Sequence, residues 1–295
     1  MIVLRIFAAD IGGTAIKYCI ANENGLLEYI GEVPTESHKG GQAIIQKVVD
    51  LISAYSKVDA ISISTAGQVN NEEGYIIYAN ENIPGYTGTR IKEMLEKEFQ
   101  VPVKVENDVN SAALGEKHFG IGKQFEDFLF LTFGTGIGGA IVINNKLYRG
   151  FNGIAGEFGH MITHTEGLLC NCGHFGCYEC YGSTRALVRE ANKINPNCTD
   201  GRILFEMIEK GDQGLYQVFQ NWAKEVAIGI VSLVHIFNPP CIIIGGGVME
   251  QSLAVEQVSK YVRERIMPSY ADVKILKSQL GNRAGLYGAI SLQKQ

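Results

Sequence analysis

The stretch from residue 157 to residue 179 reads EFGHMITHTEGLLCNCGHFGCYE. Within it lie four residues of metal-ligating type: His160, Cys170, Cys172 and Cys177. One imidazole and three thiolates form a recurrent tetrahedral zinc site. Two cysteines that are two residues apart cannot form an unstrained disulfide. The spacing therefore predicts a structural zinc ion, with free buried thiols as the alternative.

Of the remaining cysteines, Cys180 is adjacent to this set and is a weaker candidate ligand, because four positions are already filled. Three others lie far away in the sequence and are expected in the core: Cys19, Cys198 and Cys241. Seven cysteines without a disulfide framework indicate a reducing compartment, so we expect a cytoplasmic protein. The N-terminus MIVLRIFAAD lacks the pattern of a signal peptide.

Two carboxylates, Glu157 and Glu179, flank the predicted metal ligands. Carboxylates accept hydrogen bonds from hydroxyls, so a rigidly held pair suits a polyol. The run E157-F-G-H160 with C170-x-C172-G-x-x-G-C177-x-E179 resembles the signature of the ROK family of bacterial sugar kinases and sugar-responsive repressors. The resemblance implies that Glu157, His160 and Glu179 hold a sugar.

The chain begins with an apolar, β-branched run that ends at Asp10 and is followed by a glycine turn. Glycine lets backbone N–H groups approach a phosphate, and a strand-end carboxylate can hold a hydrated Mg²⁺ ion. A plain hairpin turn is the alternative. The phosphate interpretation predicts cofactor contacts at Asp10, Gly12, Gly13, Thr14 and Lys17. Lys17 supplies a cation where Ala15 departs from the lysine common in similar sequences.

The same pattern recurs from residue 128, where a strand leads into the turn GTGIGG at 134–139 and a second strand. A dinucleotide-binding fold needs a helix after the glycines, so the β-rich continuation excludes that interpretation. The duplication instead resembles the two phosphate-binding elements of the actin and hexokinase-like ATPase fold, an α/β, ribonuclease H-like architecture with two lobes. It predicts further nucleotide contacts at Gly134, Thr135, Gly136 and Gly138.

The run E-N-D-x-N-x-A-A-x-G-E from residue 106 follows a predicted strand and begins a helix. A helix N-cap is the simplest role for Asn107 or Asp108. The run also resembles the ROK catalytic segment, which implies that Asp108 is the general base and that Asn107 binds a sugar hydroxyl. The phrase N82-x-P-G resembles a ROK segment beside the sugar, and the loops near Asn82 and Gly67 are expected to decide the choice of sugar.

A short apolar strand at 241–244 leads into three glycines, and N-P-x-x-I-I-x-G-G-G resembles the adenosine segment of the family. A plain loop is the alternative. Backbone without side chains leaves room for a flat base or ribose. The adenosine contacts are therefore expected at Gly245, Gly246 and Gly247.

With 295 residues, the chain exceeds one average domain. We expect a small α/β lobe at 1–118, onto which the C-terminal helix at 284–295 packs, and a large α/β lobe at 119–283 with the zinc loop at 157–180. A net charge of −5 offers no basis for holding nucleic acid, and no apolar run is long enough to span a membrane. Since Asp10 lies ten residues from the start, we expect no DNA-binding domain before it.

Together these features predict an ATP-dependent kinase that phosphorylates the primary (6-) hydroxyl of a hexose or hexose derivative. Glucose is the default, and N-acetylmannosamine, N-acetylglucosamine and a β-glucoside offer similar hydroxyls. The expected cofactors are ATP, Mg²⁺ and structural Zn²⁺, and the resemblance implies a homodimer. The alternative is a sugar-binding regulator of the same family without kinase activity.

Overall fold

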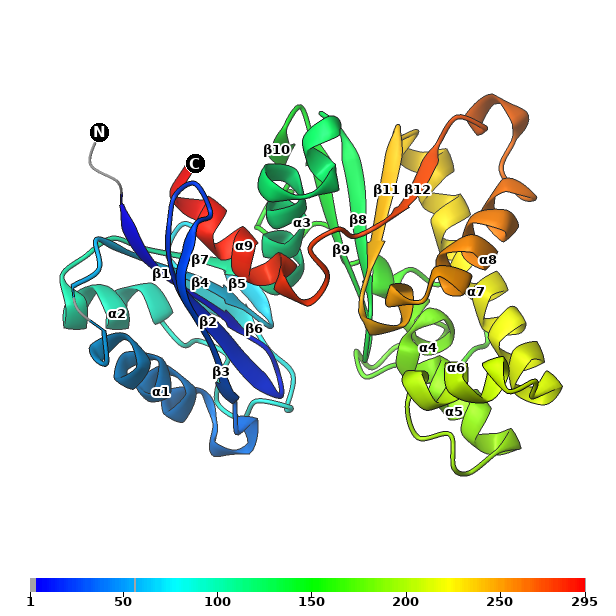
Figure 1. Ribbon diagram of the computed structural model, residues 1–295, viewed down its shortest axis with the longest axis horizontal. Coiled ribbons are helices and arrows are strands. Elements are labelled where there is room, and N and C mark those ends of the chain that lie inside the picture. The colour runs from blue at the N-terminus through cyan, green and yellow to red at the C-terminus, as the bar shows by residue number, and fades with distance from the viewer. Residues whose placement is uncertain (1–3, 56, 295) are drawn as a thin grey trace. The chain divides into compact units, whose positions relative to one another are not determined.

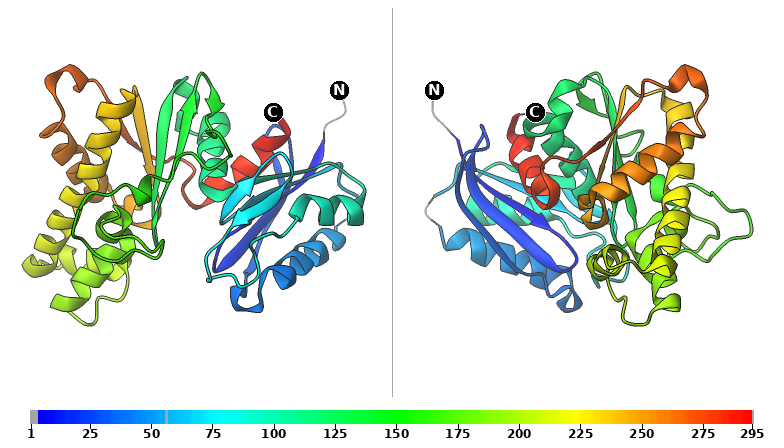
Figure 2. Two further views of the ribbon diagram at one scale, coloured as in Figure 1. Left: turned by 180° about the vertical axis from the view of Figure 1, so that it is seen from behind. Right: turned by 45° about the vertical axis from the view of Figure 1, so that its right-hand side comes forward.

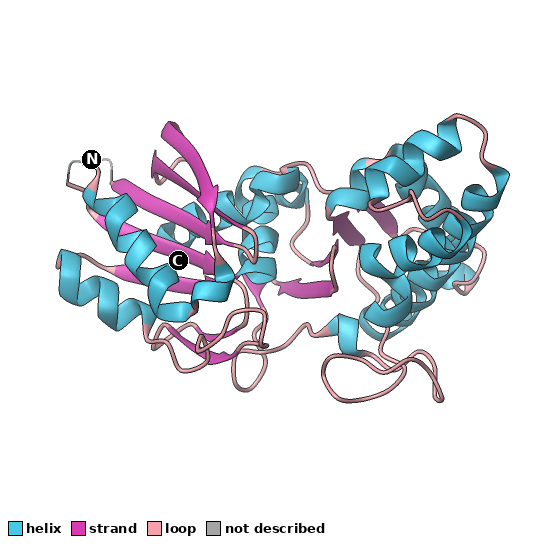
Figure 3. Cartoon of the chain, turned by 90° about the horizontal axis from the view of Figure 1, so that it is seen from below, coloured by secondary structure: helices cyan, strands magenta, loops and turns pink. Residues whose placement is uncertain are grey.

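Two five-stranded sheets organise the chain in the computed structural model, which describes residues 4–55 and 57–294. The chain divides into two compact units, one of residues 1–124, 147–155 and 283–295, the other of residues 125–146 and 156–282. Both units contain helices and strands (Figure 3). The α/β class predicted from the sequence is confirmed.

The sheet of the first unit has the order β3-β2-β1-β4-β7. Its strands are β1 (Arg5–Ile11), β2 (Ala15–Asn22), β3 (Leu27–Pro34), β4 (Ala60–Thr65) and β7 (Val103–Asn107). The first three strands form an antiparallel meander, while β4 pairs parallel with both β1 and β7. Every residue of β4 is buried, because helices cover both faces of the sheet. A small hairpin of β5 (Gln68–Asn70) and β6 (Tyr75–Tyr78) lies outside this sheet.

Alternate residues of β1 enter two different cores. Phe7, Ala9 and Ile11 belong to a core that also contains residues of α1 (Gly41–Ser53) and α2 (Ile91–Phe99). Ile6 and Ala8 pack instead with residues of α9 (Ala284–Ser291). Helices α1 and α2 therefore cover one face of the sheet, and α9 covers the other (Figure 1).

Helix α9 also packs closely on α3 (Asp108–Phe119), beside which it lies in both views of Figure 2. Glycines make this approach possible. A Cβ atom on Gly115 would collide with the Ala284 carbonyl oxygen, and one on Gly288 would collide with the Ser111 carbonyl oxygen. The final helix thereby becomes part of the first unit, next to the helix that begins at Asp108.

The sheet of the second unit has the order β10-β9-β8-β11-β12. Its strands are β8 (Phe128–Phe133), β9 (Ile137–Ile143), β10 (Lys146–Leu147), β11 (Cys241–Gly245) and β12 (Lys274–Lys277). Strand β8 pairs antiparallel with β9 and parallel with β11. The helices are α4 (Glu179–Gly182), α5 (Thr184–Ile194), α6 (Gly201–Glu209), α7 (Gln213–Phe237) and α8 (Ser252–Arg263).

Side-chain oxygens cap the N-termini of three of these helices, because the first backbone N–H groups of a helix have no partner within it. Ser183 accepts from Ala186 N in α5, Asp200 from Ile203 N in α6, and Asp212 from Leu215 N in α7. Within residues 4–55 and 57–294, no helix is both long enough and apolar enough to cross a membrane.

Candidate active site

Asp108 lies where β7 ends and α3 begins. Asn107 caps the helix: its Oδ1 accepts from Val109 N (2.9 Å) and from Asn110 N (3.1 Å). The Nδ2 of the same amide donates to Asp108 Oδ1 and to the Gly67 carbonyl oxygen, both at 2.9 Å. Asn107 is therefore the N-cap of α3 and also links two other predicted site residues, Gly67 and Asp108.

The carboxyl of Asp108 has an unusual protonation equilibrium. Burial raises the pKa of Asp108 to about 7, and the negative charge of Asp10 acts in the same direction. Hydrogen bonds from Val109 N and the Asn107 side chain oppose this shift in the pKa, because they stabilise the charged form. At neutral pH this group can accept a proton, which the task of a general base requires.

Asp10, on β1, is the second acidic group of this region. Its Oδ1 accepts from Ser64 Oγ at 2.6 Å. Burial raises the pKa of Asp10, while the Ser64 hydrogen bond and the charge of Lys17 lower it. The charge of Asp10 raises the pKa of Asp108, and carboxylate oxygens are donors that suit a bound cation such as Mg²⁺. The donors present therefore fit the predicted ion.

The turn after β1 is shaped by backbone contacts. Gly12 N donates to the Ala15 carbonyl oxygen (3.0 Å), and Thr35 donates through N to Thr14 O and through Oγ1 to Gly12 O. Gly13 and Thr14 are exposed, and no atom would lie within 4 Å of a Cβ placed on Gly13. Lys17 lies opposite Asp10 in the β1–β2 register. The predicted phosphate turn thus has an open face.

Asn82 is exposed on the loop between β6 and α2, where its backbone N donates to Asn80 Oδ1 (3.1 Å). The same loop contains Tyr86, whose buried hydroxyl bonds to Thr65 Oγ1 at 2.6 Å. The charge of Asp108 contributes to raising the pKa of Tyr86, after burial as the main cause. Tyr86 therefore ties the loop of Asn82 to the neighbourhood of Asp108. Sequence reasoning did not select Tyr86; its place two residues after Pro84 in the family-like phrase was the available signal.

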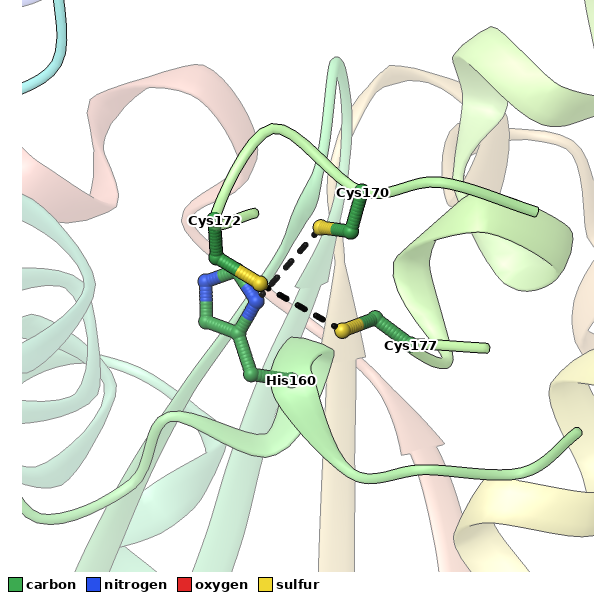
Figure 4. A group of neighbouring side chains, drawn as sticks. All are labelled: His160, Cys170, Cys172 and Cys177. Atoms are coloured by element: carbon green, nitrogen blue, oxygen red, sulfur yellow. Dashed lines mark hydrogen bonds between the residues drawn. The ribbon is translucent and has the colours of Figure 1, made fainter. Parts of the chain in front are cut away.

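The four predicted metal ligands converge in the second unit (Figure 4). Their ligand atoms all lie within 4.8 Å of one another. Cys172 Sγ is 3.6 Å from Cys177 Sγ, and Cys170 Sγ is 3.8 Å from His160 Nδ1. Zinc–sulfur bonds of about 2.3 Å at tetrahedral angles place two sulfurs about 3.8 Å apart. The donor set therefore fits one zinc ion.

Loop geometry explains this convergence. His160 ends the short 3-10 helix η3 (Phe158–His160), and a bridge between Ile162 and Cys177 joins the two ends of the loop. Gly173 and Gly176 have φ of 87° and 79°, conformations that residues with side chains rarely adopt. The turn between Cys172 and Cys177 thus brings the last cysteine back to the others.

Two predicted sugar ligands lie beside the metal set. His160 Nδ1 faces Cys170, while its Nε2 lies 4.0 Å from Glu157 Oε2. Glu179 Oε1 is 3.2 Å from Cys170 Sγ, and Glu179 Oε2 accepts from Ile137 N at 3.4 Å. Glu179 thus lies next to Cys170 of the metal set. Glu157 lies near the set through His160, whose Nδ1 faces Cys170 and whose Nε2 faces Glu157.

Glu179 also connects the zinc loop to the predicted phosphate turn at 134–139. A Cβ on Gly136 would collide with Glu179 Oε2. Within the turn, Gly134 N donates to the Gly136 carbonyl oxygen at 2.9 Å. Gly138 lies within β9, opposite Thr132.

A cavity of about 820 Å³ opens beside this turn. Its lining includes three of the predicted nucleotide residues: Gly134, Thr135 and Gly247. Gly245 ends β11, and Gly246 adopts φ 99° against the Phe133 backbone, where a side chain would collide. Helices α5 and α6 complete the lining with residues that sequence reasoning missed: Arg185, Val188, Arg189, Asn192 and Phe205. Only helix packing brings these side chains to the glycines, so no local motif marked them.

Comparisons with known proteins agree with this geometry. The family model described as the ROK family matches residues 6–295. The chain is 33% identical over 309 residues to a glucokinase of Streptomyces coelicolor, with 97% of this chain and 96% of the relative aligned. It is also 30% identical over 234 residues to the xylose repressor of Bacillus spizizenii, of which 60% is aligned against 79% of this chain.

The fold is similar to that of a solved ROK glucokinase from Streptomyces griseus in complex with glucose and AMPPNP. The TM-score is 0.87 at 33% identity, and the match covers 99% of this chain and 100% of that one. The family signature, the two duplicated sheets and the matched length all lead to one assignment: this chain belongs to the ROK family.

Proposed function

We propose that the protein is an ATP-dependent sugar kinase that phosphorylates the primary 6-hydroxyl of a hexose or hexose derivative. The observation that carries this proposal is the buried carboxyl of Asp108, whose pKa is raised to about 7 and whose orientation Asn107 holds. A regulator that only binds sugar has no need for a group adapted to remove a proton at neutral pH. The kinship to a glucokinase supports the same activity.

In this mechanism Asp108 accepts the proton of the sugar hydroxyl as that oxygen attacks the γ-phosphate of ATP. Asn107, Glu157, His160 and Glu179 hold the other hydroxyls, and Asn82 and Gly67 border the sugar. The O–P bond to the sugar forms as the bond between the γ-phosphate and ADP breaks. Positioning and charge stabilisation contribute most of the catalysis in phosphoryl transfer, so rigid hydrogen bonds around Asp108 are what the protein must supply.

Nucleotide contacts are assigned to the two glycine turns and to the cavity of the second unit. Gly12, Gly13, Thr14 and Lys17 would meet phosphates at the first turn, and Gly134, Thr135, Gly136 and Gly138 at the second. The cavity of about 820 Å³ suits a nucleoside in size, and Gly247 lines it, directly after Gly246 and after Gly245 at the end of β11. Mg²⁺ near Asp10 would supply charge neutralisation on the transferred phosphate.

Zinc would have a structural role, because four protein ligands leave no open position on the ion. Its effect on the sugar would be indirect. With Nδ1 of His160 directed to the metal, Nε2 carries the proton and is a hydrogen-bond donor on the side of Glu157. The free state of the described cysteines suits a reducing compartment, and we place the protein in the cytoplasm on that ground.

Glucose is the proposed default substrate, with N-acetylmannosamine, N-acetylglucosamine and a β-glucoside as the other candidates. A coupled assay for ADP release over these sugars decides among them. Sugar-dependent ADP release is expected for at least one. The contrary result, a sugar that raises the melting temperature without any turnover, would support the regulator.

Ligand-dependent stabilisation separates the two functions further, because a ligand that binds only the folded protein raises its melting temperature. ATP with Mg²⁺ should raise it, and a substrate sugar should raise it again. A short DNA duplex at physiological salt should have no effect; a sequence-specific shift would favour a repressor. We further propose a homodimer, which sedimentation measurements test directly.

A further inference from the structure

A partly buried ion pair contacts the residues at the start of α3. Arg149 Nε donates to Glu106 Oε2 at 2.9 Å, and the Glu106 side chain is only 1% exposed while that of Arg149 is 25% exposed. The other carboxylate oxygen, Glu106 Oε1, accepts from Asn107 N (2.9 Å) and from Asn110 Nδ2 (3.1 Å). Glu106 thus has one oxygen on Arg149 and the other on the start of α3.

Arg149 comes from a segment, residues 147–155, that leaves β10 and packs within the first unit. Ala155 N donates to the Arg149 carbonyl oxygen at 3.1 Å, which closes the segment into a compact loop. A Cβ on Gly153 would lie 3.1 Å from the Val69 carbonyl oxygen, two residues beyond Gly67. The segment therefore lies against the backbone near Gly67, to which Asn107 also donates.

We propose that Arg149 is a positioning residue for Asp108 and acts through Glu106 and Asn107. The chain of contacts is short: Arg149 holds Glu106 Oε2, Glu106 Oε1 holds Asn107 N, and Asn107 Nδ2 holds Asp108 Oδ1. Each link joins a charged or amide group to the next, so a displacement of Glu106 reaches the Asp108 carboxylate. The inference rests on the proposed kinase activity for its kinetic test only.

Removing Arg149 would leave Glu106 as a buried charge without its cationic partner. Such a carboxylate either takes up a proton or turns towards water, because an uncompensated buried charge is unfavourable. In either case its hold on Asn107 N and Asn110 Nδ2 weakens. Asn107 donates to the charged form of Asp108, so losing that hydrogen bond raises the pKa of Asp108 further.

The test compares Arg149→Met with Arg149→Lys in steady-state kinetics across pH. We expect Arg149→Met to lower kcat by about 10²-fold, since small misplacements of a catalytic group have effects of that order. The KM for ATP should stay within about threefold of the parent, and the acidic limb of the kcat/KM profile should move to higher pH. Arg149→Lys should restore part of kcat, because it keeps the charge beside Glu106.

A second variant guards against a simple loss of folding. In the double variant Arg149→Met with Glu106→Gln, no buried charge remains and the glutamine oxygen can still accept from Asn107 N. Its kcat and melting temperature should be no lower than those of Arg149→Met alone, which makes the two effects non-additive. Equal and additive losses from the two changes would overturn the proposal.

Arg90→Met is the matched control, since Arg90 pairs with Glu73 at 3.7 Å and both side chains are more than half exposed. It should behave as the parent. If Arg149→Met also keeps the parent kcat and pH profile, the proposal is wrong.

Should the parent phosphorylate no sugar, the kinase assignment fails separately. The pKa of Asp108, followed by carboxyl ¹³C NMR and assigned with Asp108→Asn, then tests positioning: it must rise in Arg149→Met, and an unchanged value refutes the role.

Discussion

The two sheets of the molecule have the same plan but contain different chemistry. In each, an antiparallel meander of three strands is extended by two strands on the other side of its first member. Asp10 is in the second-to-last residue pair of β1 and β2 before their turn. Thr132 is in the corresponding pair of β8 and β9. The first sheet thus places a carboxylate beside its turn where the second places a hydroxyl.

The turns differ in a corresponding way. A Cβ on Gly13 would meet open space, whereas one on Gly136 would strike the Glu179 carboxylate from the zinc loop. The first turn is left open for a ligand, and the second is already in contact with a predicted sugar ligand. Strand order therefore sets the position of a turn, while the residues packed against the turn decide which ligand it can meet.

The largest expected effect concerns the carboxylate of the first unit. Asp108→Asn should lower kcat by about 10² to 10⁴, the usual contribution of a general base, and should leave the fold intact. In the parent, kcat/KM should rise with pH up to about 7, the value to which the pKa of Asp108 is raised, and level off above it. Steady-state kinetics check both expectations. A variant within threefold of the parent would assign proton removal to another group.

The second prediction tests whether the metal set of the second unit affects sugar binding. Cys172→Ser should release zinc, raise the KM for sugar by at least about tenfold and lower the melting temperature, because the metal positions the groups around it. The KM for ATP should change much less. Metal analysis should give one zinc per chain in the parent.

Cys180→Ser is the control for the zinc prediction. Cys180 is adjacent to the four-ligand set but outside it, so its variant should retain zinc and the parent KM for sugar. A Cys172→Ser protein without zinc but with the parent KM would break the proposed link between metal and sugar.

The third prediction uses the contrast between the two turns. Gly136→Ala should raise the KM for sugar by several-fold, because the new methyl group displaces Glu179. Gly13→Ala should raise the KM for ATP, since the methyl group would occupy the open side where a phosphate approaches the backbone. Kinetics with each substrate varied in turn provide the measurement. An unchanged KM for sugar in Gly136→Ala, or a raised KM for sugar in Gly13→Ala, would refute the division of roles.

The last prediction concerns stability. The pKa of Asp108 is raised from 3.8 to about 7 in the folded protein, and that of Asp10 is raised as well. The folded state therefore binds more protons than the unfolded state between pH 4 and 7, so the free energy of unfolding falls as pH rises through this window. The melting temperature of the ligand-free protein should decline by about 2 to 4 °C for each kcal/mol by which the free energy of unfolding falls.

Asp108→Asn provides the control, since it removes one of the two titrating groups. Its melting temperature should depend less on pH than that of the parent. An identical pH dependence in the two proteins would contradict the assignment of the shift to Asp108.

Much of the candidate site could be predicted because it is local. Asn107 and Asp108 are adjacent, and a strand end followed by a helix start places both at one position with the amide as a cap. The zinc set is nearly as local, since two glycines between Cys172 and Cys177 indicate the tight return of the loop. The duplicated strand-turn-strand patterns indicated two related lobes, and their resemblance to a known ATPase fold predicted the α/β class.

Other features required the tertiary structure. The Glu106–Arg149 pair joins residues 43 positions apart, and the contact between Gly136 and Glu179 also joins separate stretches. The lining of the cavity of about 820 Å³ by Arg185, Arg189 and Phe205 depends on how α5 and α6 pack. The raised pKa of Asp108 likewise depends on burial by neighbouring elements.

The physical reason for this division is the range of the interactions. Residue types and spacing by themselves determined which groups could ligate zinc, cap a helix or form a glycine turn, because these contacts lie within one turn or loop. Burial, the pairing of distant charges and the shape of a cavity arise only when separate elements pack together. Tertiary structure therefore decided the proton affinity of Asp108 and the partner of Glu106.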